Sequence, residues 1–364
     1  MSSLFLAPAK PLRSLVSVLG SLAETVATPL VPADYLDLVA PLRSGADLRG
    51  RVVSVYAETA DAATVTIRPG RSWRGHRPGQ YVRIGVDVDG VRQWRAYSLT
   101  SAPDRPDGLI AITVKAIPGG RVSNHLVRRL QPGMILHLDQ AAGDFVLPQR
   151  PPPRLLFVTA GSGVTPVMGM LRHYAARLVE VVLVHSAPRP DDVIFGTELR
   201  ALAAAGRIRL VERHTATAGV LVPDELDTLV PDWHDRQTWA CGPTGLLDAL
   251  EGHWSAAGLA DRLHTERFRA VVVTAGEGGA VTFARTGAVV ETDGAAPLLE
   301  AGEAAGVSMP SGCRMGICFG CVVGLTSGAV RDLRNGELTT AAPGDGVRIQ
   351  TCVSAAASAC TLDI

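Results

Sequence analysis

The most informative stretch of the sequence is Cys313-Arg314-Met315-Gly316-Ile317-Cys318-Phe319-Gly320-Cys321, in which three cysteines are separated by four residues and then by two. A fourth cysteine, Cys352, follows after thirty intervening residues. Two irons bridged by two sulfides need four thiolate ligands, of which one loop can supply three. Glycines between the ligands let such a loop bend tightly and turn its N–H groups toward the cluster sulfurs. The spacing therefore predicts a [2Fe–2S] cluster with the ligands Cys313, Cys318, Cys321 and Cys352.

A structural zinc site is the alternative interpretation of these cysteines. Zinc sites usually combine two short Cys-x2-4-Cys units, and the present spacing with one distant cysteine fits that arrangement poorly. The chain has six cysteines, and most of them crowd near its end, which favours a metal site in a reducing compartment over a disulfide scaffold. Cys360 lies outside the pattern, and we expect it to be a buried thiol without a ligand role.

Residues 281–352 resemble a plant-type ferredoxin of the β-grasp fold. The matching pieces are Pro310-Ser311-Gly312-Cys313-Arg314-Met315-Gly316-Ile317-Cys318 and Thr351-Cys352. Phe319 stands where this family often has a small residue, which implies an altered exposure of the cluster edge. No ligand position departs from the pattern.

Composition and charge exclude several classes of protein. Acidic and basic residues balance at 35 each, whereas a nucleic-acid binder would normally be strongly basic. From Val273 onward there are nine acids and five bases, so an acidic end follows a mildly basic body. Opposite charges favour docking of two domains or of a partner, although a difference this small is also compatible with chance.

No stretch of the sequence reaches the ~20 apolar residues that a membrane span requires. Apolar residues after Lys10 and Arg13 recur at helical spacing, which predicts an amphipathic helix that packs on the protein or lies on a membrane or partner. We expect a cytoplasmic, monomeric chain, with peripheral membrane contact open only through this helix.

The hydrophobic pattern changes twice along the chain. Residues 51–116 form short alternating runs between Gly, Pro and Asp turns, which is typical of an antiparallel barrel or sandwich, with a short helix at 123–130. After Pro151-Pro152-Pro153, strands alternate with helices such as 165–178, which indicates a parallel sheet. We therefore expect a multidomain chain: a helical extension (1–46), an antiparallel β-barrel (47–150), an α/β parallel-sheet domain (151–269) and a β-grasp cluster domain (270–364).

Three segments of the predicted barrel resemble the flavin domain of the ferredoxin–NADP reductase superfamily. They are Pro78-Gly79-Gln80-Tyr81-Val82, Arg95-Ala96-Tyr97-Ser98 and Gly119-Gly120-Arg121-Val122-Ser123-Asn124-His125-Leu126. On a strand, Arg95 and Tyr97 point one way and Ser98 the other. The resemblance implies that Arg95 neutralises flavin phosphate charge, Tyr97 packs on the flavin ring or ribityl chain, and Ser98 hydrogen-bonds near N5.

The third segment implies a pyrophosphate loop at a helix N-terminus, which favours FAD over FMN. The flavin-binding candidates are Arg95, Ala96, Tyr97, Ser98, Gly120, Val122 and Ser123.

A nucleotide loop is predicted at Thr159-Ala160-Gly161-Ser162-Gly163-Val164-Thr165-Pro166, between a strand and a helix. The glycines allow close approach of a nucleotide, and the helix N-terminus suits its phosphates. Thr165 can cap the helix and Pro166 suits its first turn. Pro166 stands where the last glycine of the full dinucleotide fingerprint would be.

Two later pieces, Cys241-Gly242-Pro243 and Glu266-Arg267-Phe268, resemble the same superfamily. The resemblance implies that Cys241 lies near the nicotinamide C4 and that Glu266 and Phe268 lie at the flavin–nicotinamide junction. An ordinary core position is the alternative for Phe268. The catalytic candidates are Ser98, Cys241, Glu266 and Phe268, and the nucleotide-binding candidates are Gly161, Gly163, Thr165, Pro166, Ser186, Arg189, Cys241, Gly242 and Pro243.

NADPH is favoured over NADH by the segment His185-Ser186-Ala187-Pro188-Arg189, where the adenine ribose should lie. No acid that could hold a 2′-hydroxyl occurs before Asp191, whereas Ser186 and Arg189 suit a 2′-phosphate. A solvated arginine in a Pro-rich loop is the alternative.

The combined resemblance, over residues 50–364, implies an NADPH-dependent reductase that passes electrons through FAD and the cluster to a separate oxygenase. The histidines form no His-x-x-His or Glu-x-x-His set that would oxidise a substrate in this chain. Tyr35-Leu36-Asp37-Leu38 and Pro41-Leu42 resemble actinobacterial reductases that serve membrane-bound di-iron fatty-acyl (stearoyl-CoA type) desaturases or alkane hydroxylases. The alternatives are an NADH-dependent reductase of a ring-hydroxylating or heterocycle oxygenase, a redox sensor without turnover, and a zinc-stabilised flavoenzyme.

Overall fold

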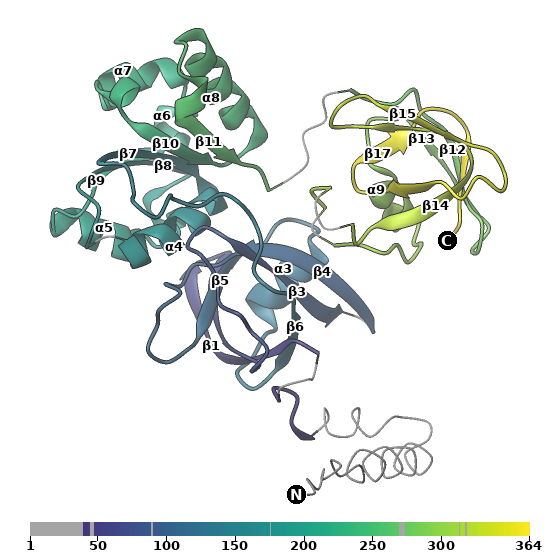
Figure 1. Cartoon of the computed structure of the whole chain (residues 1–364), viewed down its shortest axis with the longest axis horizontal. Helices are drawn as coiled ribbons and strands as arrows, with labels where there is room; N and C mark the ends of the chain where they lie inside the picture. Colours follow the sequence, from purple (N-terminus) through teal and green to yellow (C-terminus); the bar gives the residue numbers. More distant parts are fainter. Residues whose placement is uncertain are drawn as a thin grey trace, which may run out of the picture.

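The computed structural model describes residues 39–43, 47–88, 90–174, 176–268, 274–312, 314–316 and 319–364. Three folded units follow one another along the chain, coloured from blue through green to yellow in Figure 1. The expected N-terminal helix lies outside the described residues, as do Cys313 and Cys318. Within these limits, no helix has both the length and the apolar character that crossing a membrane demands.

The first unit is an antiparallel sheet of six strands in the order β4-β3-β6-β1-β2-β5. Its elements are β1 (Arg49–Thr59), β2 (Ala62–Pro69), β3 (Tyr81–Val88), β4 (Val91–Ser98), β5 (Ile110–Lys115), α3 (Arg121–Arg128) and β6 (Ile135–Leu138). A β-bridge between Leu99 and Ile112 connects the ends of the order, β4 and β5, so the sheet closes on itself. Alternating residues such as Val65 and Ile67 fill the interior, and α3 adds Leu126 to the same core. The predicted antiparallel barrel is confirmed.

The second unit is a parallel sheet of five strands in the order β11-β10-β7-β8-β9. Its strands are β7 (Arg154–Ala160), β8 (Glu180–Ala187), β9 (Arg209–His214), β10 (Gln237–Cys241) and β11 (Leu263–Glu266). Its helices are α4 (Val164–Tyr174), α5 (Gly196–Ala204), α6 (Thr215–Ala218), α7 (Leu226–Leu229) and α8 (Thr244–Ala256), with short 3-10 turns η1 (Gly161–Gly163), η2 (Pro190–Asp192), η3 (Pro223–Glu225), η4 (Trp233–Asp235) and η5 (Ala260–Arg262).

Both faces of this sheet are buried, which explains the continuous apolar run of β7. Leu155 and Phe157 enter the core that contains α4 and α5, while Leu156 and Val158 enter the opposite core with α7 and α8. The strand order changes direction at β7, whose two neighbours β8 and β10 are reached by crossovers on opposite sides. Ligands of such sheets bind at the carboxyl ends of the strands at this switch point.

The third unit is a mixed sheet with the order β13-β12-β18-β14-β15, in which β16 and β17 also pair with β14. Its elements are β12 (Gly279–Phe283), β13 (Ala288–Thr292), α9 (Leu298–Ala304), β14 (Val322–Asp332), β15 (Leu338–Ala341), β16 (Arg348–Gln350), β17 (Ser354–Ala356) and β18 (Cys360–Leu362). Only β12 and β18 run parallel, and α9 packs Leu298 and Leu299 into the core, as expected for a β-grasp domain. Cys360 is part of this core, and burial raises the pKa of its thiol to about 11.

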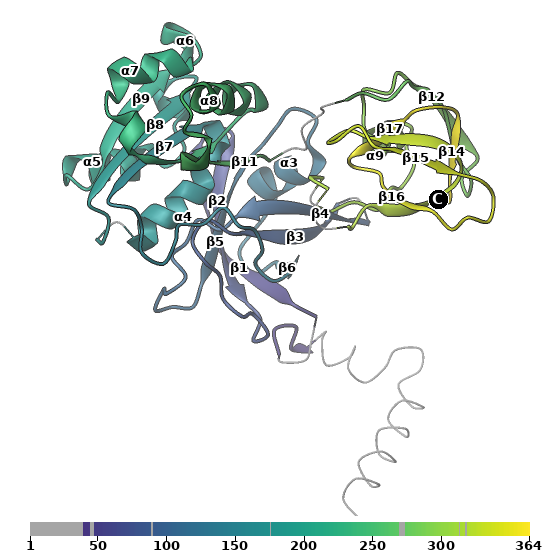
Figure 2. The ribbon, with the colours of Figure 1, turned by 45° about the horizontal axis from the view of Figure 1, so that its top comes forward.

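The third unit lies beside the barrel in both overall views, on the side of β3 and β4 (Figures 1 and 2). A groove between the two units is lined by Arg83 and Trp94 of the barrel and by Ser311 and Gly320 of the cysteine loop. The arrangement therefore brings the cysteine loop to the strand that carries Ser98.

Candidate functional site

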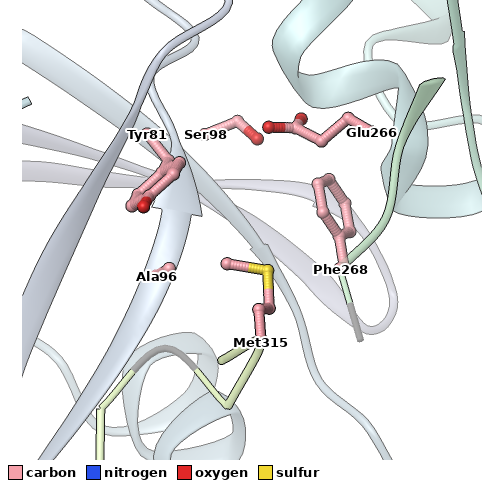
Figure 3. A pocket seen from close by; sticks show the side chains of 6 residues that line it. All are labelled: Tyr81, Ala96, Ser98, Glu266, Phe268 and Met315. Carbon is pink, nitrogen blue, oxygen red and sulfur yellow. The ribbon is translucent and has the colours of Figure 1, made fainter. Parts of the chain in front are cut away.

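All three units contribute to one small pocket. Tyr81, Ala96 and Ser98 come from the barrel, Glu266 and Phe268 from the end of β11, and Met315 from the cysteine loop (Figure 3). Two of the four proposed catalytic side chains, Ser98 and Glu266, point toward one another across it. At this pocket, groups bound to the three units could come into contact.

Ser98 and Glu266 each carry a buried oxygen atom without a hydrogen-bond partner among the described residues. Ser98 is only 4% exposed, and the two atoms are its Oγ and the Oε2 of the half-buried Glu266. Burial raises the pKa of Glu266 to about 8, so its carboxyl group is mostly protonated at neutral pH. Burying a polar atom without a hydrogen-bond partner costs free energy. A ring with polar atoms along its edge, placed in this pocket, would give both oxygens a hydrogen-bond partner.

Strand β4 presents its two faces differently, as the alternation in the sequence predicts. Ala96 and Ser98 line the pocket, whereas Tyr97 packs against the barrel core, where burial raises the pKa of its phenol. The aromatic ring that the barrel contributes to the pocket is that of Tyr81, the cross-strand partner of Ser98. Sequence reasoning gave Tyr81 no role, because its proximity to Ser98 depends on the register between β3 and β4.

Arg95 is a half-buried cation without a carboxylate partner among the described residues. One of its guanidinium nitrogens donates to the carbonyl of Trp94 at 2.8 Å, and burial lowers its pKa to about 10. A nearby Arg314 lowers this pKa further, and Glu303 acts in the opposite direction. Such a group fits an anion such as a flavin phosphate, which would restore its charge balance.

The start of α3 is the second element that fits a flavin phosphate. Gly120 is the N-cap and provides no side-chain cap, and the first turn holds no acidic residue. A Cβ on Gly120 would collide with Ile117 and with the Ser123 hydroxyl, which itself donates to the Gly120 carbonyl at 3.3 Å. Val122 contributes its side chain to the barrel core instead. Free N–H groups and the helix dipole favour negative charge at this end.

The predicted nucleotide loop lies at the switch point of the parallel sheet. Gly163 lies so close to the end of β10 that a Cβ would overlap the carbonyl oxygen of Cys241. Gly161 has a φ of +54° and open space around its Cα, which leaves room for a ligand above the loop. The 3-10 turn of Gly161–Gly163 leads directly into α4, which buries Pro166 in its first turn.

Thr165 differs from its expected role as a helix cap. The helix α4 already begins at Val164, and the Thr165 hydroxyl donates to the carbonyl of Ser162 at 2.9 Å. It therefore holds the loop from within the helix, because the preceding 3-10 turn had already started the helical conformation.

Cys241 and Glu266 are neighbours at the carboxyl ends of β10 and β11, where they form a strand pair. Cys241 is fully buried, and burial, reinforced by the nearby Glu266, raises the pKa of its thiol well above the ordinary value. The thiol stays protonated at neutral pH, which excludes a thiolate nucleophile and is compatible with a packing role. Gly242 and Pro243 then lead into α8, with Pro243 as its N-cap.

The end of β8 carries the residues predicted to select the nucleotide. Ser186 is buried and its Oγ has no partner, while the Arg189 side chain is 72% exposed and pairs with Asp192 at 3.1 Å. Arg213 of β9, which the sequence did not single out, pairs with Ser186 in the sheet and forms an ion pair with Glu225 at 2.7 Å. Ser186 and Arg213 are thus neighbours on adjacent strands, and the Arg213 guanidinium also donates to the carbonyls of Gly219, Ala218 and Val220.

Two of the four cluster cysteines are described, and they converge. The Sγ atoms of Cys321 and Cys352 are 3.2 Å apart in the interior, a distance too long for a disulfide bond between them. The Thr351 hydroxyl donates to the Cys321 carbonyl at 2.9 Å, so the segment with the fourth ligand is tied to the loop. Two sulfurs that face one another without bonding fit shared metal ligation.

The rest of the loop is held by residues that the sequence did not predict. Arg334 and Gln350 both donate to the Gly316 carbonyl at 3.0 Å. The pKa of Arg334 is raised by its hydrogen bond to Asp332 and, to a smaller extent, by Cys352 and Cys321. Phe319 has a φ of +56° and is 67% exposed, so an aromatic ring stands at the surface two residues before Cys321.

Known proteins match the three units in the same order. Residues 55–146 match the model of the oxidoreductase FAD-binding domain, residues 157–251 the oxidoreductase NAD-binding domain, and residues 281–357 the 2Fe-2S iron-sulfur cluster binding domain. The structure of phthalate dioxygenase reductase shares the fold with a TM-score of 0.58 and 23% identity, covering 87% of this chain and 97% of that one.

Two relatives extend the match to nearly the whole chain. The NADPH oxidoreductase of Mycobacterium tuberculosis is 50% identical over 353 residues, which is 95% of this chain and 92% of the relative. The glycine betaine monooxygenase reductase subunit of Pseudomonas aeruginosa is 30% identical over 338 residues, with 83% and 91% covered. The chain therefore belongs to the ferredoxin–NADP reductase superfamily, as an oxidoreductase whose FAD-binding, NAD(P)-binding and C-terminal [2Fe–2S] domains lie on one polypeptide.

Proposed function

We propose that the protein oxidises NADPH and delivers the electrons one at a time to a separate oxygenase. One observation carries the proposal: a single pocket is shared by the flavin barrel, the nucleotide domain and the cysteine loop. FAD, when bound, supplies the ability to accept an electron pair and release it in single steps. Each NADPH would lose a hydride, which carries two electrons and one proton. The proton would be released, and the two electrons would leave through the cluster to the acceptor, one at a time.

The proposed roles follow from the placement of the side chains. Arg95 and the start of α3 would hold the flavin phosphates, and Ser98 would hydrogen-bond the flavin ring. Cys241 and Glu266, side by side at the strand ends, would position the nicotinamide, and the ring of Phe268 would cover the junction. The ligands of the cluster would be Cys321 and Cys352, completed by Cys313 and Cys318.

NADPH is proposed as the donor because Ser186, Arg189 and Arg213 lie at the strand ends where the adenine ribose should lie. Ser186 offers an unpartnered hydroxyl, Arg189 is exposed on the following loop, and Arg213 is on the adjacent strand. A 2′-phosphate needs such donors. The name of the mycobacterial relative, NADPH oxidoreductase, supports the same choice.

The domain limits are proposed at 47–150, 151–269 and 270–364. The first limit is supported by the prolines at 151–153, which immediately precede the first strand of the parallel sheet. The second is supported by Phe268, the last described residue of the nucleotide domain, and by Thr274, whose amide donates to the Leu333 carbonyl of the cluster domain.

The partner is proposed to be an oxygenase in the broad sense. Reductases named for a monooxygenase and a dioxygenase share the domain arrangement, which supports this class. Within it, a membrane di-iron fatty-acyl desaturase or alkane hydroxylase is supported by the resemblance of residues 35–42 to reductases of such systems. A ring-hydroxylating oxygenase is the second candidate, favoured by the name of the structural relative.

Reconstitution tests the proposal. Purified holoprotein, NADPH and either a candidate desaturase or a ring-hydroxylating oxygenase should give NADPH-dependent product with one of the two. A Cys352→Ser variant should keep flavin reduction and ferricyanide reduction but lose cytochrome c reduction and product. Iron and acid-labile sulfide should be present in equal amounts in the wild type. Bound zinc, or an absence of steady NADPH turnover, would overturn the proposal.

A further inference from the structure

Met315 has a position that ligand spacing alone does not explain. It lies between the first two cluster cysteines in sequence, yet its side chain lines the pocket that also holds Ser98 and Glu266. Figure 3 shows the thioether between the barrel residues Tyr81 and Ala96 on one side and Phe268 on the other. Met315 is thus the cluster domain's contribution to the place where the other two domains meet.

The backbone on both sides of Met315 is fixed in the left-handed region. Arg314 has a φ of +61° and Gly316 a φ of +73°. A non-glycine residue in this conformation is strained, so it persists only where the surrounding contacts stabilise it.

Three side chains stabilise this backbone conformation. Arg314 forms an ion pair with Glu303 of α9, and the Gly316 carbonyl accepts hydrogen bonds from Arg334 and Gln350 at 3.0 Å. A Cβ at Gly316 would collide with the Arg334 guanidinium, so the two groups are closely packed. The backbone is therefore held on both sides of Met315, whose side chain lines the pocket.

The chemistry of methionine suits such a contact. Its unbranched thioether fills irregular gaps between packed surfaces and brings no charge. A charged or short residue at position 315 would admit water between the cysteine loop and the barrel.

We propose that Met315 is a positioning residue that holds the cysteine loop against the flavin pocket and thereby sets the rate of electron transfer from flavin to cluster. The inference rests on the proposed function. In this step the flavin would give up one electron at a time and be oxidised, the cluster would accept that electron and be reduced, and no bond would form or break in the protein. The preceding hydride step involves Ser98, Cys241 and Glu266 and does not need Met315.

Anaerobic rapid mixing with NADPH separates the two steps in the holoprotein. In Met315→Ala, flavin reduction should stay within about twofold of the wild-type rate, while cluster reduction should slow by about tenfold or more, because displacements near 1 Å already have large effects on rates. Met315→Leu keeps an apolar side chain of similar size and should recover most of the lost rate. Met134→Ala, which removes a 40% exposed methionine of the barrel, is the matched control and should change neither step.

A second readout does not depend on turnover. Without nucleotide, hydrogen exchange in β4 and in residues 306–316 should be faster in Met315→Ala than in Met134→Ala, while iron content and the cluster's electron paramagnetic resonance spectrum stay as in the wild type. Equal cluster reduction in Met315→Ala and wild type would overturn the inference, and so would equal slowing of both steps. If wild-type cluster is not reduced by NADPH at all, the proposed function itself fails.

Discussion

At the scale of single residues, Glu266 shows how burial changes the pKa of a carboxyl group. Its native pKa of about 8 lies above the ordinary value of 4.5. Between these values the native carboxyl keeps a proton that the unfolded chain has lost, so stability is present at low pH and falls as pH rises toward 8. Glu266→Gln removes this dependence. From pH 5.5 to 8, the wild type should lose on the order of 2 kcal/mol of unfolding free energy relative to the variant, measured by denaturant titration of the holoproteins.

If the unfolding free energies of wild type and Glu266→Gln differed by the same amount at both pH values, this expectation would be contradicted. The difference between the two proteins is the informative quantity, because ionisations elsewhere in the chain cancel in it.

Sequence reasoning found the residues whose role follows from a local pattern. Ser98 was expected near flavin N5, Glu266 and Phe268 were expected at the flavin–nicotinamide junction, and the structure brings all three to one pocket. Tyr81 and Met315, which line the same pocket, were not expected as site residues. Their proximity arises from a strand register and from the docking of a third domain, and no local spacing encodes either of these.

At the scale of elements, the first strand–helix connection of the parallel sheet depends on Gly163. A Cβ there would overlap the Cys241 carbonyl oxygen, a backbone atom that has little freedom to move. Gly163→Ala should therefore separate the loop from β10 and weaken NADPH binding by about tenfold or more, measured by nucleotide titration. Gly252→Ala, in the middle of α8 with open space around it, is the matched control and should leave binding unchanged.

Unaltered NADPH affinity in Gly163→Ala would show that the loop tolerates the added methyl group and that the close approach has no role in binding.

A helix or strand could be predicted where its apolar residues follow a single period along the sequence. The apolar residues of β7 are typical of a buried strand, and they are divided between two core clusters on its two faces. The helix expected at 165–178 is shorter, because α4 ends at Tyr174. The long strand β14 was not predicted, since it pairs with β15, β16, β17 and β18 along its length and its side chains alternate between different surroundings.

At the scale of the whole molecule, charge is unevenly divided. The cluster domain from Val273 onward holds nine acids and five bases, whereas the remainder of the chain holds 26 acids and 30 bases. A basic acceptor should be attracted to the acidic domain, and salt should screen that attraction. Cytochrome c reduction should therefore fall severalfold between about 0.02 M and about 0.3 M salt.

Ferricyanide, a small anion, is the control acceptor, and its reduction should not fall over the same range. A cytochrome c rate that is constant or rises with salt would show that docking does not use this charge difference.

The short chain segment that joins the last two domains sets a limit on where electrons can be delivered. Phe268 lies in the pocket, and Thr274, six positions later, is already hydrogen-bonded to Leu333 of the cluster domain. Six extended residues span at most about 20 Å. The attachment point of the ferredoxin module, Thr274, therefore stays within about 20 Å of Phe268 in any orientation. The module can turn about this point, but an acceptor always meets it tethered beside the pocket that Phe268 lines.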